Sequence, residues 1–181
     1  MGNKLYNLFL TFNATSLMIV IFLIKQHCII INKAPNWISY LIFISIPVLM
    51  TGSSLLCTRF LSTDSIEGNV KDLEHANNAY LPSYLGYFFV ALSVPDVETL
   101  VFVFLILFVF TYFSQTIYFN PLFLLWKRHF YYVTTENNIK IFLITRKVLR
   151  KPSDVRFENL KRINNYTFID NGGGKSELSD G

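Results

Sequence analysis

The sequence predicts an α-helical membrane protein with four transmembrane helices, both termini cytoplasmic, and a small C-terminal cytoplasmic α+β domain. Three observations predict this class. Hydrophobic residues make up 52% of the 181-residue chain and charged residues only 15%, whereas soluble domains carry about 25% charged residues. The hydrophobic residues stand in long runs, including eleven in succession at 100–110. Of the sixteen Lys and Arg residues, eleven follow Trp126.

The hydrophobic runs are long enough to cross a bilayer. A helix needs about 20 residues to cross a hydrocarbon layer of about 30 Å, and the run ending at Phe119 has that length. The third run is short, and local thinning of the bilayer would accommodate it. We therefore predict a transmembrane domain over residues 1–121, with spans at 5–24, 36–57, 80–94 and 99–119 and an intervening cytoplasmic loop at 58–79.

The basic residues that flank the spans set the orientation. Four spans place both termini on one side of the membrane, and Lys and Arg are concentrated on the cytoplasmic side of membrane proteins. Basic residues crowd the chain after the fourth span, while the opposite loops hold only Lys25 and Lys33. We therefore expect both termini and the loop 58–79 to face the cytoplasm.

The loop 58–79 has the pattern of a short amphipathic helix. Ile66, Val70 and Leu73 recur at helical spacing. The loop is acidic and the tail on the same side is basic, which suggests that Asp72 and Glu74 dock on the tail.

The tail after Pro121 is predicted to be a basic domain over 122–170, followed by a flexible segment at 171–181. Alternating apolar residues on either side of a short polar turn are typical of a β-hairpin. Such a small domain is expected to be stabilised by contact with the helices or with other subunits. The expected elements are strands at 130–135 and 139–145, a short helix carrying Val155, Phe157, Leu160 and Ile163, and a third strand at 166–169.

No arrangement of residues in the sequence indicates catalysis or a cofactor. Nucleotide-binding and hydrolase motifs are missing from the sequence. The histidines His27, His75 and His129 fall in separate segments, so we expect no metal site. The sequence therefore predicts a protein that is not an enzyme and holds no cofactor.

The spans contain small and hydroxylated residues and no ionisable ones between their ends. Because ion-coupled transport usually needs ionisable residues within the membrane, a pump of that kind is disfavoured. The polar residues are expected mainly to pack helices together. The alternative is the lining of an oligomeric pore, for which Gln115 is the first candidate.

Two acidic residues, Asp96 and Glu98, stand at the external start of the fourth span. Asp96 is expected to cap that helix, and both carboxylates favour the positive end of its dipole. In a cyclic oligomer they would also form an outer ring that senses an external partner or attracts cations.

The basic tail has two kinds of explanation. It sets the orientation of the chain and contacts anionic lipid headgroups, or it docks an acidic cytosolic protein or nucleic acid. The residues predicted to bind a partner are Asp72, Glu74, Lys127, Arg128, Arg146, Lys147, Arg150, Lys151, Lys161 and Arg162.

The four hydrophobic runs, the tight Pro95–Glu98 hairpin and the basic tail around Phe130–Thr145 resemble the KwaA family, the membrane subunits of the bacterial Kiwa anti-phage defence system. The resemblance implies a homotetramer in the bacterial inner membrane that responds to phage attachment. It also implies a cytosolic DNA-binding partner, KwaB, so that nucleic acid is contacted only indirectly.

We therefore expect a multi-pass inner-membrane scaffold that senses disturbance of the envelope and presents a cytoplasmic platform to a KwaB-like protein. Two other functions stay open on the sequence. One is an oligomeric ion channel or membrane-depolarising effector, and the other is an accessory subunit of a transporter.

Overall fold

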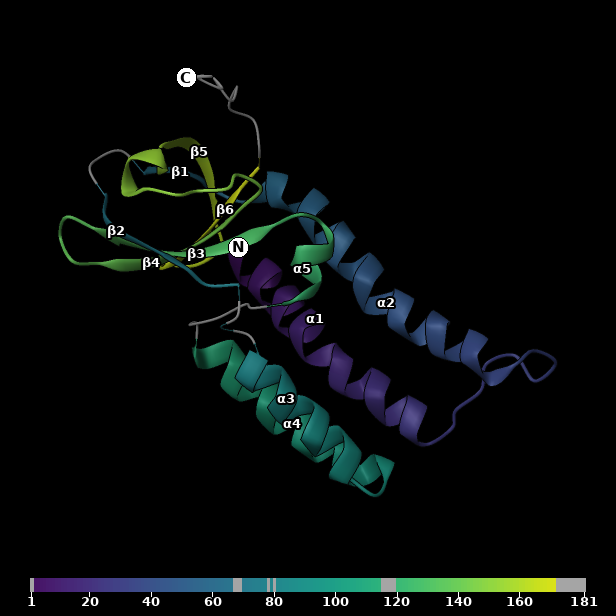
Figure 1. The fold of residues 1–181 in the computed structure, drawn as a ribbon. Coiled ribbons are helices and arrows are strands. Elements are labelled where there is room, and N and C mark those ends of the chain that lie inside the picture. Colours follow the sequence, from purple (N-terminus) through teal and green to yellow (C-terminus); the bar gives the residue numbers. More distant parts are fainter. Residues whose placement is uncertain (1, 67–69, 78, 80, 115–119, 172–181) are drawn as a thin grey trace. The chain divides into compact units, whose positions relative to one another are not determined.

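The computed structural model describes residues 2–66, 70–77, 79, 81–114 and 120–171. The chain divides into two compact units (Figure 1). The helical unit contains Lys4–Leu56 and Asn78–Leu122. The sheet unit is discontinuous, because it combines Asn3, Cys57–Asn77 and the chain from Phe123 onward.

Within the described residues, the helical unit has four helices that overlap the predicted spans, and residues 115–119 of the fourth predicted span lie outside those residues. Among the described residues, three helices are long and apolar enough to cross a membrane, namely α1, α2 and α4. Helix α3 has 13 residues and a length of about 20 Å at 1.5 Å per residue. The bounds are α1 Gly2–Lys25, α2 Asn36–Cys57, α3 Leu81–Ser93 and α4 Val97–Ser114.

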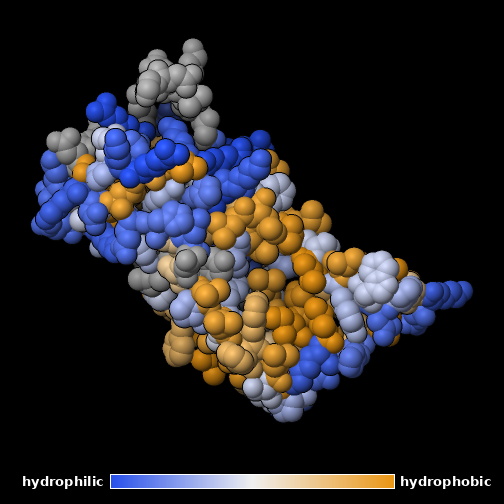
Figure 2. Space-filling model, viewed as in Figure 1, coloured by the Kyte–Doolittle hydropathy of each residue, from blue (hydrophilic) through white to orange (hydrophobic). Residues whose placement is uncertain are grey.

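Many large hydrophobic side chains of the helices are exposed, and they gather over the helices on the face shown in Figure 2. Phe89, Phe102 and Phe113 are more than 60% exposed. The buried positions of α1 and α2 include many small polar side chains: Thr11, Asn13, Thr15, Ser16, Ser39, Thr51 and Ser54. This arrangement, with apolar residues outside and small polar residues between helices, is typical of membrane bundles.

The buried hydroxyl of Thr51 joins three segments of the helical unit. It donates to the carbonyl oxygen of Pro47 at 2.8 Å and accepts from the side-chain amides of Asn13 at 2.8 Å and Asn120 at 3.1 Å. A hydroxyl has one hydrogen and two lone pairs, so these contacts use all of its capacity. Helix α1, helix α2 and the turn at Asn120 are thus held at one point.

Helix α1 also contacts the α3–α4 hairpin. Met18 and Phe22 pack in one cluster with Ala91, Val94 and Leu100. The hydroxyl of the buried Tyr84 on α3 donates to the carbonyl of Ala14 at 3.0 Å. Helix α1 is therefore the central helix, and the predicted role of the polar residues in helix packing is confirmed for these contacts.

The sheet unit contains one six-stranded sheet with the order β1-β5-β6-β4-β3-β2. All neighbouring pairs are antiparallel except β4 and β6, which are parallel. The strands are β1 Thr63–Ile66, β2 Val70–His75, β3 His129–Thr135, β4 Lys140–Thr145, β5 Phe157–Arg162 and β6 Thr167–Asp170, with a short helix α5 at Leu122–Leu125.

The predicted hairpin and the strand near residue 167 are confirmed as β3, β4 and β6. Two predictions of helix are wrong. Ile66 is the last residue of β1, and Val70 and Leu73 lie in β2 instead of an amphipathic helix. Phe157–Arg162 is strand β5, preceded by a 3-10 turn at Pro152–Asp154. In both places, pairing with distant strands overrides a spacing that mimics a helix.

The sheet must be strongly curved, because its two edge strands are joined by a very short link. Only residues 67–69 separate Ile66 of β1 from Val70 of β2, so these two Cα atoms lie within about 14 Å of each other. Across six flat strands at about 4.8 Å spacing, the edges would lie about 24 Å apart. The sheet therefore curls and brings its edges toward one another at this end.

The inner face of the curved sheet holds the main apolar core. Tyr131 and Val133 of β3 and Leu143 of β4 are buried there with Leu149, Val155, Phe157 and Leu160. On the other face, Phe130 stacks on Phe142 and meets Phe123 of α5 edge to face. Side chains cover both faces of the hairpin, as the alternation of its residues predicts.

Candidate functional site

The predicted partner-binding residues lie in the sheet unit, and a basic loop over residues 146–156 contains four of them. This loop connects β4 to β5 and has five cationic residues against one acid. Arg146, Arg150 and Lys151 are exposed, and Val148 at its tip is 65% exposed. The loop therefore presents positive charge together with one apolar side chain.

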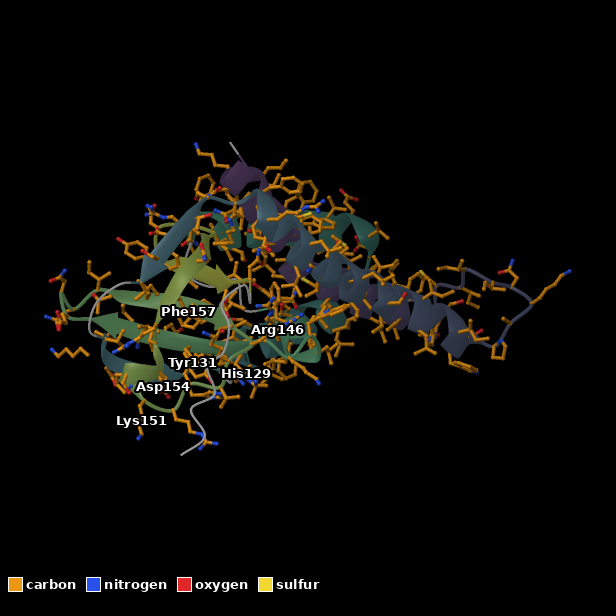
Figure 3. All side chains as sticks on the ribbon, turned by 90° about the horizontal axis from the view of Figure 1, so that it is seen from above. His129, Tyr131, Arg146, Lys151, Asp154 and Phe157 are labelled. Carbon is orange, nitrogen blue, oxygen red and sulfur yellow. The ribbon has the colours of Figure 1, made fainter. Side chains whose placement is uncertain are left out.

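The basic loop is held in place by packing and by hydrogen bonds. Leu149 is buried in the core, and its N–H donates to the hydroxyl of Tyr131 at 3.1 Å. The ammonium group of Lys147 lies 4.8 Å from the ring centre of Phe157. Figure 3 shows Tyr131 and Phe157 in the same part of the sheet unit as Arg146.

The one acid of the loop is used inside the loop. A carboxylate oxygen of Asp154 accepts the backbone N–H groups of Arg150 at 2.9 Å and Lys151 at 3.0 Å. These hydrogen bonds lower the pKa of Asp154 below its usual value, and the one from Arg150 has the largest effect. Among the described residues neither ion pair involves the basic loop, so its cationic side chains are available to an anionic partner.

Three of the predicted partner-binding cations, Arg128, Lys161 and Arg162, donate hydrogen bonds within the sheet unit. Arg128 is only 4% exposed and its guanidinium donates to the backbone carbonyl of Asp170. Lys161 donates to the hydroxyl of Thr63 at 2.6 Å. We leave Arg128 out of the partner surface, since a buried side chain does not reach a docked protein.

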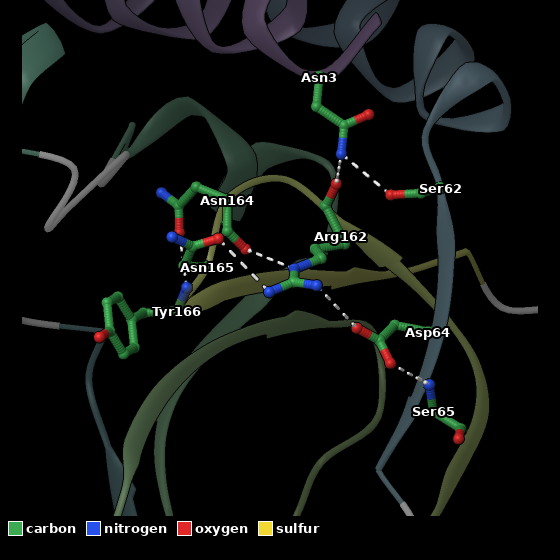
Figure 4. A network of polar contacts seen from close by, with 8 residues as sticks. All are labelled: Asn3, Ser62, Asp64, Ser65, Arg162, Asn164, Asn165 and Tyr166. Atoms are coloured by element: carbon green, nitrogen blue, oxygen red, sulfur yellow. Dashed lines mark hydrogen bonds and ion pairs between the residues drawn. The ribbon is translucent and has the colours of Figure 1, made fainter. Parts of the chain in front are cut away.

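Arg162 is the centre of a polar network at the β1–β5 edge (Figure 4). Its guanidinium lies 3.8 Å from the carboxylate of Asp64. It also donates to the carbonyl of Asn164 and to the side chain of Asn165, both at 3.4 Å. Long contacts of this kind orient the guanidinium while leaving it partly exposed.

The first turn of α1 forms hydrogen bonds with the same network. The side-chain amide of Asn3 donates to the backbone carbonyl of Arg162 at 2.9 Å and to the hydroxyl of Ser62 at 3.0 Å. The start of helix α1 is thus hydrogen-bonded to the sheet (Figure 4).

The acidic residues of the loop 58–79 meet the tail by strand pairing. Asp72 and Glu74 lie on the edge strand β2, which pairs with β3. Glu74 forms an ion pair with Lys140 at 2.7 Å, and Lys140 also lies over the ring of Tyr132. The hydrogen bond that the ammonium group of Lys140 donates to Glu74 is the main cause of the raised pKa of Lys140.

Two histidines that the sequence places in separate segments are neighbours in the sheet. The ring centres of His75 and His129 lie 6.5 Å apart, and His75 meets Tyr131 edge to face. Asn77 accepts the backbone N–H of Phe130 at its side-chain oxygen, and its amide nitrogen lies 3.1 Å from Nδ1 of His129. The amide group of Asn77 is thereby oriented to donate to that nitrogen.

Within the described ranges, no three His, Cys, Asp or Glu side chains are grouped in a way that would hold a metal ion. Sequence reasoning missed the histidine pair because 53 residues separate the end of β2 from the start of β3. An alternation that assigned residues 70–75 to a strand would have been the only signal for it.

The predicted external residues are partly described. Both carboxylate oxygens of Asp96 bind Thr99, one through its backbone N–H at 2.8 Å and one through its hydroxyl at 3.0 Å. Asp96 thus caps α4 as predicted, and these bonds lower the pKa of its carboxyl. Glu98 is exposed in the first turn of α4. Gln115 lies outside the described residues.

The fold defines the chain as a bundle of membrane-length hydrophobic helices joined to a small, curved β-sheet with a basic surface. A protein-family comparison identifies the particular family. Residues 6–169 match the model described as "Anti-phage protein KwaA", and the chain belongs to this family. The match extends over most of the chain and includes parts of both units.

Comparisons with curated proteins and with solved structures gave no match. Family membership assigns the chain to anti-phage defence, and the three membrane-length helices are consistent with a membrane location.

Proposed function

We propose that this chain is a non-enzymatic, multi-pass subunit of the bacterial inner membrane that senses envelope disturbance when a phage attaches. In this proposal it assembles as a homo-oligomer, with a tetramer as the expected form. Its sheet unit scaffolds a cytosolic, DNA-binding, KwaB-like protein, through which nucleic acid is reached indirectly. The defence role rests on the family, and the remaining steps are argued below.

The connections between the two units support four membrane crossings. The chain leaves the sheet unit at Asn3 and Asn77, and it returns at Cys57 and Phe123. A folded sheet lies on one side of a membrane, so each excursion must cross an even number of times. Because α4 has the length and composition of a span, α3 must supply the other crossing of its excursion, with local thinning of the bilayer.

The exposure of α4 supports assembly with other copies. Only 6% of the most hydrophobic stretch of α4 is buried within the chain, compared with 50% for α1. A helix with so little contact inside its own chain must be covered by lipid or by another subunit. A homo-oligomer would bury part of this surface.

The basic loop supports docking of an acidic surface of the partner. Its cationic side chains carry no ion pair among the described residues, and Leu149 and Val155 hold the loop against the core. A surface that is rigid before binding loses little conformational freedom when a partner docks.

The single observation that carries the proposal is that the segments leading into and out of all four helices converge on one sheet. Asn3 of α1 binds the β1–β5 edge, and α2 runs directly into Thr58–Phe60 and β1. Strand β2 precedes α3, and α5 leads from α4 into β3. A shift between helices would therefore reach the surface on which the partner docks, provided that two arrangements differ in partner affinity.

Charge reversal in the basic loop tests the docking. The double variant Arg150→Glu/Lys151→Glu places like charges against the partner, and we expect about tenfold or greater loss of KwaB-like protein retained by the tagged, membrane-extracted subunit. The matched control is Lys33→Glu, an exposed cation in the predicted external loop. Unchanged retention in the double variant would reject the docking surface.

Planar bilayers containing the purified chain test the rival function. The scaffold proposal expects no steady current. A selective current that Asp96→Asn alters would instead favour the oligomeric ion channel.

A further inference from the structure

Three positions beside helix ends share a cation next to an exposed, large apolar side chain. They are Lys4–Leu5 at the start of α1, Arg59–Phe60 just after α2, and Trp126–Lys127 just after α5. Leu5 is 71% exposed, Phe60 is 70% exposed and Trp126 is 38% exposed. Each position lies where the chain passes between the sheet unit and a helix of the bundle.

These side chains are held outward by a packed local structure. The guanidinium of Arg59 lies 4.9 Å from the ring centre of Phe60. Helix α5 is fixed by Phe123, which is fully buried against Phe130. The turn that follows is closed by a hydrogen bond from the N–H of Trp126 to the carbonyl of Phe123 at 3.1 Å.

The opposite ends of the helices use their charges differently. The ammonium group of Lys25 at the end of α1 is part-buried and donates to the carbonyl of Val94 at 2.6 Å. The α3–α4 hairpin exposes the carboxylates of Asp96 and Glu98. Among the described residues, Lys33 is the exposed cation near these ends, whereas Lys4, Arg59 and Lys127 are exposed at the sheet-side ends.

We propose that the two cation–apolar pairs of the sheet unit, Arg59–Phe60 and Trp126–Lys127, bind anionic phospholipid at the cytoplasmic headgroup layer. Apolar and aromatic side chains favour the membrane interface, where an adjacent cation meets the lipid phosphate. The sheet unit is thereby seated on anionic lipid through Phe60 and Trp126. This inference rests on the membrane topology proposed above and does not require partner docking.

Fluorescence of a single tryptophan tests the surface. The chain has two tryptophans, so Trp37→Phe leaves Trp126 as the only reporter in the full-length protein. The variant is reconstituted in phosphatidylcholine vesicles that contain nitroxide-labelled phosphatidylglycerol or nitroxide-labelled phosphatidylcholine. We expect quenching mainly by labels near the headgroup and preferential quenching by phosphatidylglycerol.

Removing one cation should reduce that preference. A basic residue near an anionic surface changes association by about fivefold, so Lys127→Gln should lower the relative association of phosphatidylglycerol at Trp126 by about that factor. Arg59→Gln provides a second variant. The matched control carries Trp126→Phe, so that Trp37 reports from the other end of α2, and Lys127→Gln should leave its quenching unchanged.

Three results would overturn the proposal: quenching of Trp126 by aqueous acrylamide but not by lipid labels, shielding of Trp126 from both, or a phosphatidylglycerol preference that survives both substitutions. Shielding from both would mean that a second copy covers the site. Washing the membranes with alkaline carbonate distinguishes failure of the lipid-binding proposal from failure of the proposed membrane topology. Release of the protein from the membranes would reject the topology as well.

Discussion

The two units of this chain bury opposite kinds of side chain. In the helical unit, Phe102 and Phe113 are exposed while Asn13 and Thr51 are completely buried. In the sheet unit, Leu143 and other large apolar residues are buried, and cations such as Arg150 lie outside. The sheet unit is organised as a domain that faces water, whereas the helical unit is organised for a surrounding that is itself apolar.

This difference shows which interactions specify each structure. Burial of apolar surface favours the folded sheet. Between helices in lipid that driving force is absent, so close packing and polar contacts such as the Thr51 hydroxyl determine the arrangement. The following predictions test whether the two units obey these separate rules.

The largest expected effect is loss of a core leucine from the sheet unit. Leu143→Ala should destabilise that unit by about 2–5 kcal/mol, because the site is completely buried. The matched variant Leu105→Ala removes the same atoms from α4, where Leu105 is 50% exposed, and should change stability by about 0.5 kcal/mol or less. Pulse proteolysis of the full chain in lipid bicelles measures both. Equal losses would contradict the comparison.

A smaller effect is expected at the polar contact of the helical unit. Thr51→Val keeps the shape of the side chain but leaves the buried amides of Asn13 and Asn120 without this acceptor. The expected loss is about 1–2 kcal/mol, measured by unfolding in mixed micelles. Thr51→Ser retains the hydroxyl and should lie close to wild type. A Val variant as stable as wild type would refute the role of this contact.

The stability of the basic loop should fall at acid pH, because Asp154 becomes protonated there. The folded pKa of Asp154 is lowered, chiefly by the N–H of Arg150, so its stabilising effect is present above the unfolded pKa of about 3.9 and is lost as the pH falls through the folded value. Limited proteolysis should show the loop opening in that acidic range. Asp154→Asn should remove this transition and Asp96→Asn should retain it, whereas an unchanged profile in Asp154→Asn would assign the transition elsewhere.

The smallest effect is expected at the ion pair of the sheet edge. The side chains of Glu74 and Lys140 are 59% and 53% exposed, respectively, so Glu74→Gln should destabilise the sheet unit by at most about 0.5 kcal/mol. Added salt should reduce even that difference, as measured by denaturant unfolding. A loss above about 1 kcal/mol would show that this edge is more shielded than its exposure indicates.

The helices were predictable because each is encoded in one continuous stretch. The predicted span 36–57 matches α2 residue for residue, since its apolar run and its ends are local features. The β3–β4 hairpin was likewise predictable from local alternation about a polar turn.

The remaining strands depend on partners that are distant in the sequence. Strand β5, with the sequence Phe-Glu-Asn-Leu-Lys-Arg, has weak strand propensity, yet it pairs with β1 on one side and β6 on the other. A register shift in β1 between Asp64 and Ile66 further disturbs the alternation. Spacing alone therefore resembled a helix at both places.

The candidate site was predictable in composition but only partly in geometry. The exposed positions of Arg146, Arg150 and Lys151 follow from the density of charge in that segment. The burial of Arg128 does not, because it depends on the carbonyl of Asp170 in a strand 42 residues away. The neighbouring positions of His75 and His129 require the same kind of long-range pairing.

The short link between β1 and β2 ties the two edges of the sheet together. Helix α2 leads into the edge strand β1, and the other edge strand, β2, leads into α3. Moving the end of α2 away from the start of α3 would pull on both edge strands, and moving these two helix ends together would release that tension. In the proposed topology, a lateral strain in the bilayer would thus change the curvature of the sheet.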